Sequence, residues 1–226
     1  MPWPYYARPA GGDVRAADVE AVRRRQWELG VPEAFEWIAD LAPTLAPAAR
    51  AAGLDVLEVP LMVLDRPLEA PPVAARVRRL EPDDAALAAS RAVADLAFGS
   101  SPDAGPAERD AALGQWPETR LAAVRARMAA GITVTVVAED ADGVLAVGSH
   151  QPVGGVTEVV GIGTLPACRR RGLGAAVTAA LAADARRTGA DVVFLSAGDE
   201  RIARMYGRLG FRRVGTAGLA EPPVSS

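Results

Sequence analysis

The most constraining feature of the chain is a turn rich in arginine and glycine, placed between a strand-like run and an amphipathic helix. The turn spans residues 166–174 and reads Pro-Ala-Cys-Arg-Arg-Arg-Gly-Leu-Gly. Residues 156–164 before it have the β-branched content of a strand, with glycines where another backbone can come close. After it, apolar residues recur every four positions from Leu173 to Ala185, as on one face of a helix. Because the first N–H groups of a helix lack partners within the helix, this turn predicts a phosphate-binding site.

The phosphate motifs of other cofactor classes fit this turn poorly. The chain has no Gly-Lys-Ser/Thr there, and Gly161-Ile162-Gly163 lacks the third glycine of a dinucleotide fingerprint. Arg169-Arg170-Arg171-Gly172-Leu173-Gly174 instead resembles the Gln/Arg-x-x-Gly-x-Gly/Ala signature of the GCN5-related N-acetyltransferase (GNAT) superfamily. Pro166 stands three residues ahead of the first arginine, as is common in that family. The resemblance implies that acetyl-CoA binds here as the acyl donor, and no metal is expected.

A second signature follows at the distance usual for this family. Residues 191–196 read as a buried strand, and residues 200–211 are similar to the family's closing helix, Asn-x-x-Ala-x-x-x-Tyr-x-x-x-Gly-Phe in outline. Glu200 stands where Asn is usual, so the family's contact from Asn to the pantetheine arm lacks its usual residue. The residues that match are Ala203, Tyr206, Gly210 and Phe211, with two residues between Ala203 and Tyr206, which is the common spacing in the family.

The composition narrows the class of protein. The chain has 226 residues, half of them hydrophobic, which indicates a globular protein rather than a disordered one. Its net charge of -3 argues against nucleic acid as the main partner. The single cysteine, Cys168, excludes an internal disulfide and fits a reducing compartment. No signal-peptide pattern and no long apolar run is present, so a cytoplasmic protein without membrane contact is expected.

Three regions are expected along the chain: an N-terminal region over residues 1–72, an acetyltransferase domain over 75–220 and a tail over 221–226. Three prolines in residues 67–72 indicate a connector between the first two. The elements expected in the domain are a strand at 76–80, a helix from Asp83 or Asp84 to Phe98, a helical region at 107–130 interrupted at Pro117, a hairpin around Asp142-Gly143, and a last strand at 211–215.

This order predicts an α/β fold with a mixed central sheet. The strands beginning at Val156 and Asp191 should be parallel neighbours, joined by a right-handed crossover through the helix from Leu173. In the resembling family these two strands splay apart, and the acyl-pantetheine arm enters between them.

The N-terminal region carries no catalytic motif. Residues 18–29 and 33–52 are expected to be helical, and 54–64 to be a strand broken at Pro60. A degenerate half of an acetyltransferase domain would have a similar order. Six aromatic residues lie here, for which core packing is the default interpretation and a substrate surface or homodimer contact the alternative. They are Trp3, Tyr5, Tyr6, Trp27, Phe35 and Trp37.

The resemblance assigns cofactor contacts residue by residue. The backbone N–H groups from Arg171 to Ala175 would hold the pyrophosphate, while Arg169 and Arg170 supply charge. A Cβ at Gly172 or Gly174 would push the phosphate off these amides. The cofactor-binding residues expected are Ile162 and Thr164 through their backbone, Arg169, Arg170, Arg171, Gly172, Leu173, Gly174, Ala175, Glu200 and Ala203.

Acetyl transfer to an amine needs proton transfers. An alkyl amine with a pKa near 10.4 is mostly protonated at pH 7, and its neutral form costs roughly 4 to 5 kcal/mol. Glu158, on the strand where many family members carry a glutamate, is the first candidate base, and an exposed strand residue is the alternative interpretation. His150, the only histidine, is the second candidate, with a turn histidine as its alternative. Tyr206 would protonate the leaving thiolate as general acid.

The expected function is therefore acetyl transfer from acetyl-CoA to a primary amine by direct attack. The acceptor is a small-molecule amine or a protein amine, which the sequence does not distinguish. A non-catalytic acyl-CoA sensor or assembly subunit is the alternative, and it has no need of an acid and a base beside the thioester.

Overall fold

The computed structural model describes residues 6–68 and 72–223, which form two compact units. The first unit contains the chain up to Met62, residues 196–207 and the chain from Arg212. The second contains residues 63–195 and 208–211. The units are divided at Met62 and Val63, whereas the sequence predicts a boundary between the N-terminal region and the acetyltransferase domain at residues 72–75. The predicted domain boundaries stay predictions. Trp3, Tyr5, part of the predicted connector and the end of the predicted tail lie outside the described residues.

The second unit is built on a mixed sheet with the strand order β7-β6-β5-β4-β3. Its first three pairs along the chain, β3–β4, β4–β5 and β5–β6, are antiparallel, whereas β6–β7 is parallel. The predicted α/β class with a mixed sheet is thus confirmed. The strands are β3 (Arg76–Arg79), β4 (Val134–Asp140), β5 (Gly143–Val153), β6 (Val156–Thr164) and β7 (Val192–Ser196).

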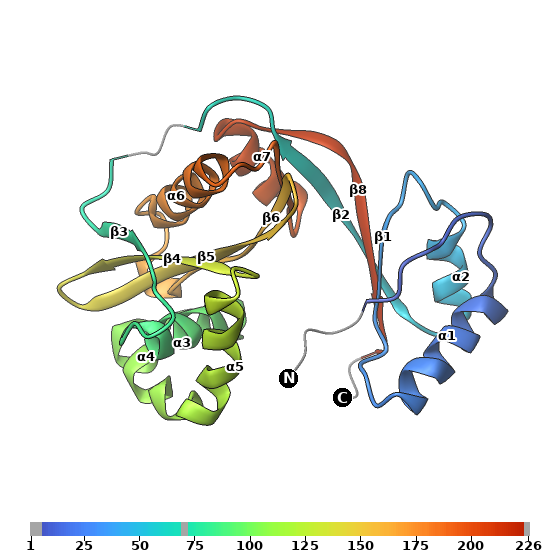
Figure 1. Ribbon diagram of the computed structural model, residues 1–226, viewed down its shortest axis with the longest axis horizontal. Coiled ribbons are helices and arrows are strands. Elements are labelled where there is room, and N and C mark those ends of the chain that lie inside the picture. Colours follow the sequence, from blue (N-terminus) through green and yellow to red (C-terminus); the bar gives the residue numbers. More distant parts are fainter. Residues whose placement is uncertain (1–5, 69–71, 224–226) are drawn as a thin grey trace. The chain divides into compact units, whose positions relative to one another are not determined.

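Helices cover both faces of this sheet (Figure 1). One face carries α6, and the other carries a layer that includes α3. Each of these two helices packs closely on a glycine of the sheet. A Cβ on Gly148 would lie 2.3 Å from Ile162 and 3.0 Å from Leu181 of α6, and a Cβ on Gly163 would lie 2.7 Å from Ala97 of α3. The helices are α3 (Leu87–Phe98), α4 (Pro106–Ala112), α5 (Glu118–Ala129) and α6 (Leu173–Arg187), with 3-10 turns η1 (Leu113–Gln115) and η2 (Pro166–Cys168).

Local signals in the second unit predicted its elements well. Pro117 precedes the first residue of α5 and ends the preceding turn, as its missing N–H favours. Asp142 and Gly143, which has a φ of 89°, form the expected hairpin between β4 and β5. Asp84 accepts the Ala86 N–H at 2.9 Å in the turn before α3, but neither it nor Asp83 caps the helix as predicted, because the N-cap is Ala86.

The first unit pairs strands from the two ends of the chain. Its strand order is β1-β8-β2, and β1 is antiparallel to β8, with Phe35 opposite Ala220 and Trp37 opposite Gly218. A Cβ on Gly218 would lie 2.2 Å from the Trp37 ring, so only glycine fits beneath this indole. The elements are α1 (Ala16–Glu28), β1 (Phe35–Ile38), α2 (Leu45–Ala51), β2 (Asp55–Leu64), α7 (Glu200–Arg208) and β8 (Phe211–Glu221).

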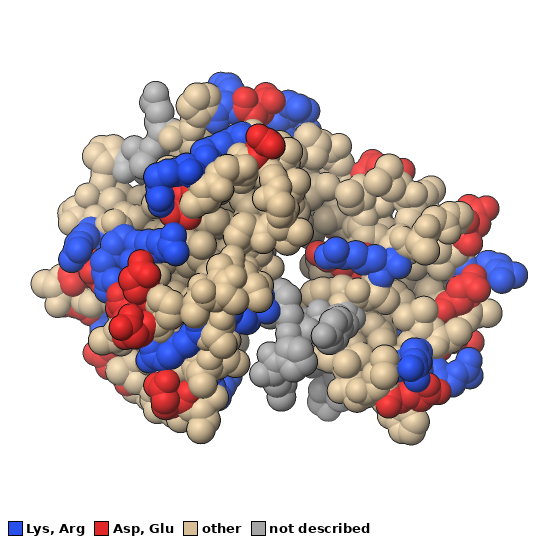
Figure 2. Space-filling model, viewed as in Figure 1, with Lys and Arg blue, Asp and Glu red and all other residues tan. Residues whose placement is uncertain are grey.

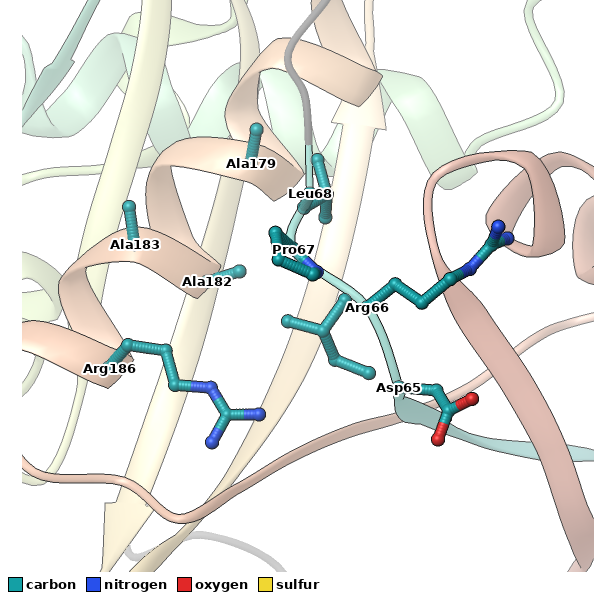
Figure 3. Close-up of a pocket in the computed structure, with 9 residues that line it drawn as sticks. Asp65, Arg66, Pro67, Leu68, Ala179, Ala182, Ala183 and Arg186 are labelled. Atoms are coloured by element: carbon teal, nitrogen blue, oxygen red, sulfur yellow. The ribbon is translucent and has the colours of Figure 1, made fainter.

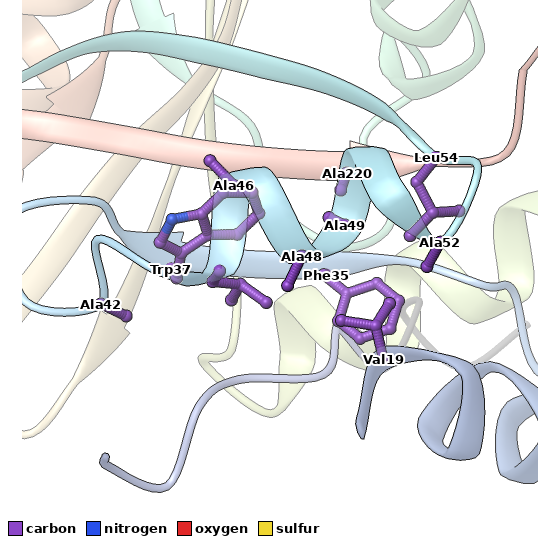
Figure 4. Packing of buried hydrophobic residues seen from close by; sticks show 11 residues of the cluster. Val19, Phe35, Trp37, Ala42, Ala46, Ala48, Ala49, Ala52, Leu54 and Ala220 are labelled. Carbon is purple, nitrogen blue, oxygen red and sulfur yellow. The ribbon is translucent and has the colours of Figure 1, made fainter. Parts of the chain in front are cut away.

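A hydrophobic cluster holds α1 and α2 against these strands (Figure 4). Phe35 and Trp37 are each 4% exposed and lie in it, so core packing is their role, whereas Trp27 is 75% exposed. The buried members are Val19, Phe35, Trp37, Ala42, Leu45, Ala46, Ala48, Ala49, Ala52, Leu54 and Ala220.

Three predictions for these elements were wrong. Residues 33–52 are not one helix, because the segment contains strand β1 before α2. Strand β2 is not broken at Pro60, whose carbonyl accepts the Ala197 N–H at 2.9 Å and so keeps a backbone hydrogen bond without needing an N–H of its own. The last strand does not end at 215, since pairing with β1 extends β8 to Glu221.

Candidate active site

The parallel strands β6 and β7 pair over only a short stretch. The paired residues are Val156 with Val192, Thr157 with Val193, and Glu158 with Phe194. Beyond Glu158, β6 continues to Thr164 along β5, without a partner in β7 among the described residues. The two strands therefore stop pairing after Glu158, as predicted, and the edge of β6 that faces β7 has no partner strand there among the described residues.

A bulge lies in the diverging part of β6. Gly161 has a φ of 62°, and the register with β5 shifts between Val147 and Ser149. The side chains of Ile162 and Thr164 point toward the first turn of α6, since a Cβ on Gly174 would lie 3.6 Å and 3.5 Å from them. The residues expected to offer their backbone to the acyl donor thus lie beside residues 166–174, the turn that is predicted to bind phosphate and is called the phosphate turn below.

The turn before α6 has the backbone of an anion site. Gly172 is the N-cap with a φ of 78°, a left-handed conformation that favours glycine. The first hydrogen bond of α6 runs from the Ala176 N–H to the Gly172 carbonyl, at 3.0 Å. The N–H groups of Leu173, Gly174 and Ala175 therefore have no acceptor within the helix, and they lie at its positive end. Gly174 tolerates a Cβ with ordinary contacts, so crowding inside the protein does not require glycine there.

The three arginines of the turn have different surroundings. Arg169 donates to the Ala97 carbonyl at 2.8 Å and so closes the end of α3, which sequence analysis missed. Arg171 pairs with Asp140 of β4 at 3.1 Å, and this hydrogen bond raises its pKa. Arg170 is exposed and has a φ of 66°, unusual for a residue with a side chain. All three arginines are exposed, and the hydrogen bonds of Arg169 and Arg171 hold the turn in position.

Glu158, the candidate base, lies where β6 and β7 begin to diverge. It is the last β6 residue paired with β7, and Gln151 of β5 is opposite it. The side chain of its neighbour Thr157 points to the α6 face, because Thr157 contacts His150, which in turn contacts α6. Successive side chains alternate along a strand, so Glu158 points to the α3 face, where it is partly exposed.

His150, the second candidate base, is fully buried. Its Nε2 lies 3.0 Å from Asp184 Oδ2 of α6, and its Nδ1 lies 2.9 Å from Thr157 Oγ1. Since a carboxylate only accepts, Nε2 donates to Asp184. Asp184 also accepts from Arg187 and, at 3.5 Å, from Arg79. Both ring nitrogens are thus engaged in the interior, which does not favour proton exchange with an acceptor, and a role of His150 as a base stays a prediction.

Helix α7 of the first unit carries the second signature. Asp199 caps it, accepting the Ile202 N–H at 2.6 Å through its side chain and the Ala203 N–H at 2.9 Å through its carbonyl. The aspartate one turn before Ala203 was the signal that sequence analysis missed. Glu200 pairs with Arg213 of β8 at 2.7 Å, and Tyr206 is 6% exposed. Gly210, with a φ of 106°, reverses the chain after the helix, as predicted.

A hollow of about 440 Å³ lies elsewhere on α6 (Figure 3). Residues 64–68 form one wall, and Ala179, Ala182, Ala183 and Arg186 form the other. These α6 residues follow Leu173 by 6 to 13 positions, which is about 9 to 20 Å along a helix. The hollow is therefore distinct from the phosphate turn.

The described residues include no cluster of His, Cys, Asp and Glu that could hold a metal ion. None of the helices in 6–68 and 72–223 is long and apolar enough to cross a membrane. Arginines and carboxylates are interspersed on the face in Figure 2, in agreement with the many ion pairs.

Comparison with known proteins agrees with this geometry. The family model described as acetyltransferase (GNAT) family matches residues 101–211. A GCN5-related N-acetyltransferase from Kribbella flavida is 23% identical with a TM-score of 0.69, and the match covers 96% of this chain and 81% of that one. A GCN5-related N-acetyltransferase from Sphaerobacter thermophilus is 18% identical with a TM-score of 0.58, covering 93% and 68%.

A functionally unknown conserved protein from Staphylococcus epidermidis ATCC 12228 is also similar, with 14% identity and a TM-score of 0.61. That match covers 94% of this chain and 82% of the other. No curated protein sequence matches this chain significantly. At these identities the solved structures establish a shared fold.

Proposed function

Residues 101–211 belong to the GNAT acetyltransferase family, and from this premise we propose that the protein transfers the acetyl group of acetyl-CoA to a primary amine. The observation that carries the proposal is the divergence of β6 and β7 after Glu158, directly upstream of the phosphate turn. Strand β6 then offers its unpaired edge to the pantetheine arm. The turn between β6 and α6 offers its backbone amides to the pyrophosphate.

The residues present fit acetyl-CoA. The left-handed Gly172 and the free amides of the first turn of α6 suit a pyrophosphate, and Arg170 adds an exposed positive charge. The open edge of β6 between Val159 and Thr164 suits the two amides of pantetheine, which can pair as an added strand would. Glu200 is held by Arg213 and does not replace the missing Asn.

Acetyl-CoA, when bound, supplies an activated acetyl group. Glu158 takes a proton from the ammonium form of the acceptor, directly or through a water, so that the neutral amine can form the new C–N bond. As the C–S bond breaks, Tyr206 donates its hydroxyl proton to the leaving thiolate. The second proton that the amine nitrogen loses then returns to the Tyr206 oxygen. An unperturbed tyrosine hydroxyl has a pKa near 10 and so carries a proton to donate at neutral pH.

Two measurements test the proposal in order. Calorimetric titration with acetyl-CoA and with dephosphorylated pantetheine compares ligands with and without the phosphates. We expect tight binding of acetyl-CoA alone, and binding of neither would contradict the proposal. Turnover of a panel of amines then follows for the wild type and for Glu158→Gln and Tyr206→Phe, with Glu81→Gln, an exposed glutamate outside the site, as control.

We expect each site variant to bind acetyl-CoA normally and to lose about 100-fold in kcat, the lower end for a general acid or base. The control should retain full turnover. Undiminished turnover in both site variants would exclude these roles. Binding of acetyl-CoA without turnover of any amine by the wild type would favour the acyl-CoA sensor instead.

A further inference from the structure

A partly buried arginine in the helical layer of the second unit lacks a hydrogen-bonding partner. Arg91 lies in the middle of α3, and its Nε is buried without a hydrogen bond. In the part of the chain that the structure describes, its guanidinium has neither a hydrogen bond nor an ion pair. Its neighbours differ: Arg78 pairs with Glu139 at 2.6 Å, and the buried Arg109 pairs with Asp110 at 2.7 Å.

The guanidinium of Arg91 is stacked on an aromatic ring. It lies 5.1 Å from the centre of the Trp116 ring, and the guanidinium of Arg120 lies 4.0 Å from that centre. Stacking engages the face of a guanidinium and leaves its N–H edge available for a planar anion. Both guanidinium groups thus lie against one indole, and Arg120 also donates to the Gln115 carbonyl at 2.5 Å, which leaves its remaining N–H groups for a ligand.

The nearby carboxylate does not neutralise Arg91. Asp95, one turn further along α3, accepts the Trp116 Nε1–H at 2.7 Å and so holds the indole in position. Burial is the largest influence on Arg91 and lowers its pKa, Asp95 opposes this shift, and Arg120 adds to it. An arginine remains charged in proteins, so this positive charge lies in a partly buried place without an anion in contact.

The layer that carries this cluster covers the face to which Glu158 points. Ala97 and Phe98 at the end of α3 lie against Gly163 of β6, and Arg169 of the phosphate turn closes the same helix. Arg91 lies two turns earlier, about 10 Å along α3 from Phe98. Arg91 and Glu158 thus lie on the same side of the sheet, as an acceptor with an amine at one end and an anion at the other would require.

From these observations we propose that Arg91 and Arg120, stacked on Trp116, bind the carboxylate of an acidic small-molecule acceptor. The inference deepens the proposed function and rests on it, since it assigns the acceptor class. A carboxylate accepts two parallel hydrogen bonds from a guanidinium, and an uncharged amide cannot replace it.

The test compares acids with matched neutral amines. The probes are glycine, β-alanine, 4-aminobutanoate and 6-aminohexanoate, each with its carboxamide, which together vary the distance between amine and carboxylate. Equilibrium binding is measured by calorimetry without acetyl-CoA, and kcat/KM is measured with it. The proteins are full-length wild type, Arg91→Gln, Arg91→Lys, and Arg76→Gln, whose arginine is 76% exposed on β3.

We expect at least one acid to bind about tenfold or more tightly than its amide. Arg91→Gln should abolish this preference, Arg91→Lys should keep part of it, and Arg76→Gln should keep all of it. The thermal unfolding of each variant and its binding of acetyl-CoA show whether it is folded.

The outcomes separate this inference from the acetyltransferase proposal. Binding of an acid that depends on Arg91, without turnover of any amine, would support the carboxylate site and contradict the transferase. Turnover of neutral amines with no preference for acids would overturn the carboxylate site alone. Failure of all four acids to bind, or an equal loss for acids and amides in Arg91→Gln, would also overturn it, because a purely structural arginine gives these results.

Discussion

At the scale of single residues, Gly172 connects backbone conformation to ligand binding. Its φ of 78° costs a residue with a side chain roughly 1 kcal/mol. We expect Gly172→Ala to lower the free energy of unfolding by about that amount and to weaken acetyl-CoA binding about tenfold, because the Cβ intrudes on the phosphate turn. Gly114→Ala is the control, since a Cβ on Gly114 would meet no other part of the protein within 4 Å. Calorimetry should show normal binding for the control, and equal affinities in both variants would argue against the turn as the phosphate site.

Asp84 connects a side-chain charge to stability. The hydrogen bond from Arg78 lowers its pKa, and the Ala86 N–H acts in the same direction. A lowered pKa stabilises the fold above the unfolded value near 4 and loses this contribution as the pH falls through the folded value. We expect Asp84→Asn to cost about 2 kcal/mol at pH 7, typical for hydrogen bonds to a charged group.

The cost of Asp84→Asn should shrink as the pH falls below about 4, where the wild type also loses its carboxylate. Urea unfolding at pH 7, 5 and 3 measures it, with the exposed neighbour in Asp83→Asn as control. A difference from the wild type that stays constant across this pH range would contradict the assignment.

At the scale of elements, Asp184 joins β5, β6 and α6. It accepts from His150, which contacts Thr157, so one carboxylate fixes the strand of the candidate base against the helix of the phosphate turn. We expect Asp184→Asn to destabilise the protein by roughly 3 kcal/mol, because a buried ion pair is broken. Chemical denaturation measures this, and Asp103→Asn in an exposed loop should leave the midpoint unchanged. Equal midpoints for the two variants would show that the network does not hold these elements together.

The elements also show which parts of the fold are readable from sequence. Helix α6 and the hairpin at Gly143 depend on nearby residues, so periodicity and turn chemistry predicted them. Strand β1 was missed because its strand character depends on pairing with β8, about 180 residues away. Short apolar runs are ambiguous between helix and strand until such a partner is known.

In the candidate site too, features set by neighbouring residues could be predicted from the sequence, whereas contacts between distant residues could not. The phosphate turn is a contiguous motif, so its glycines and arginines were identified directly. The partners of His150 and Arg169 lie in other elements, at Asp184 and Ala97, and no local pattern indicates them. Burial of His150, which disfavours it as a base, is likewise a tertiary property.

At the scale of the whole molecule, the two units differ from the predicted domain over 75–220. Helix α7, with Tyr206, and most of β8 belong to the unit formed by the chain up to Met62. Ala220 of β8 lies in the hydrophobic cluster with Phe35 and Trp37, and β8 pairs with β1. The helix that carries most of the second signature thus belongs to the same compact unit as the N-terminal region.

A fragment of residues 73–226 tests this dependence. We expect it to lose the ordered structure of α7 and β8, since removal of β1, β2 and the helices exposes the apolar face that Ala220 helps to form. Circular dichroism should show less helix and strand per residue than in the full chain, and unfolding should be less cooperative. Acetyl-CoA binding should weaken, because α7 carries the second signature of the family. A fragment that folds and binds acetyl-CoA like the full chain would instead support an autonomous domain over 75–220 and make the first unit an addition to it.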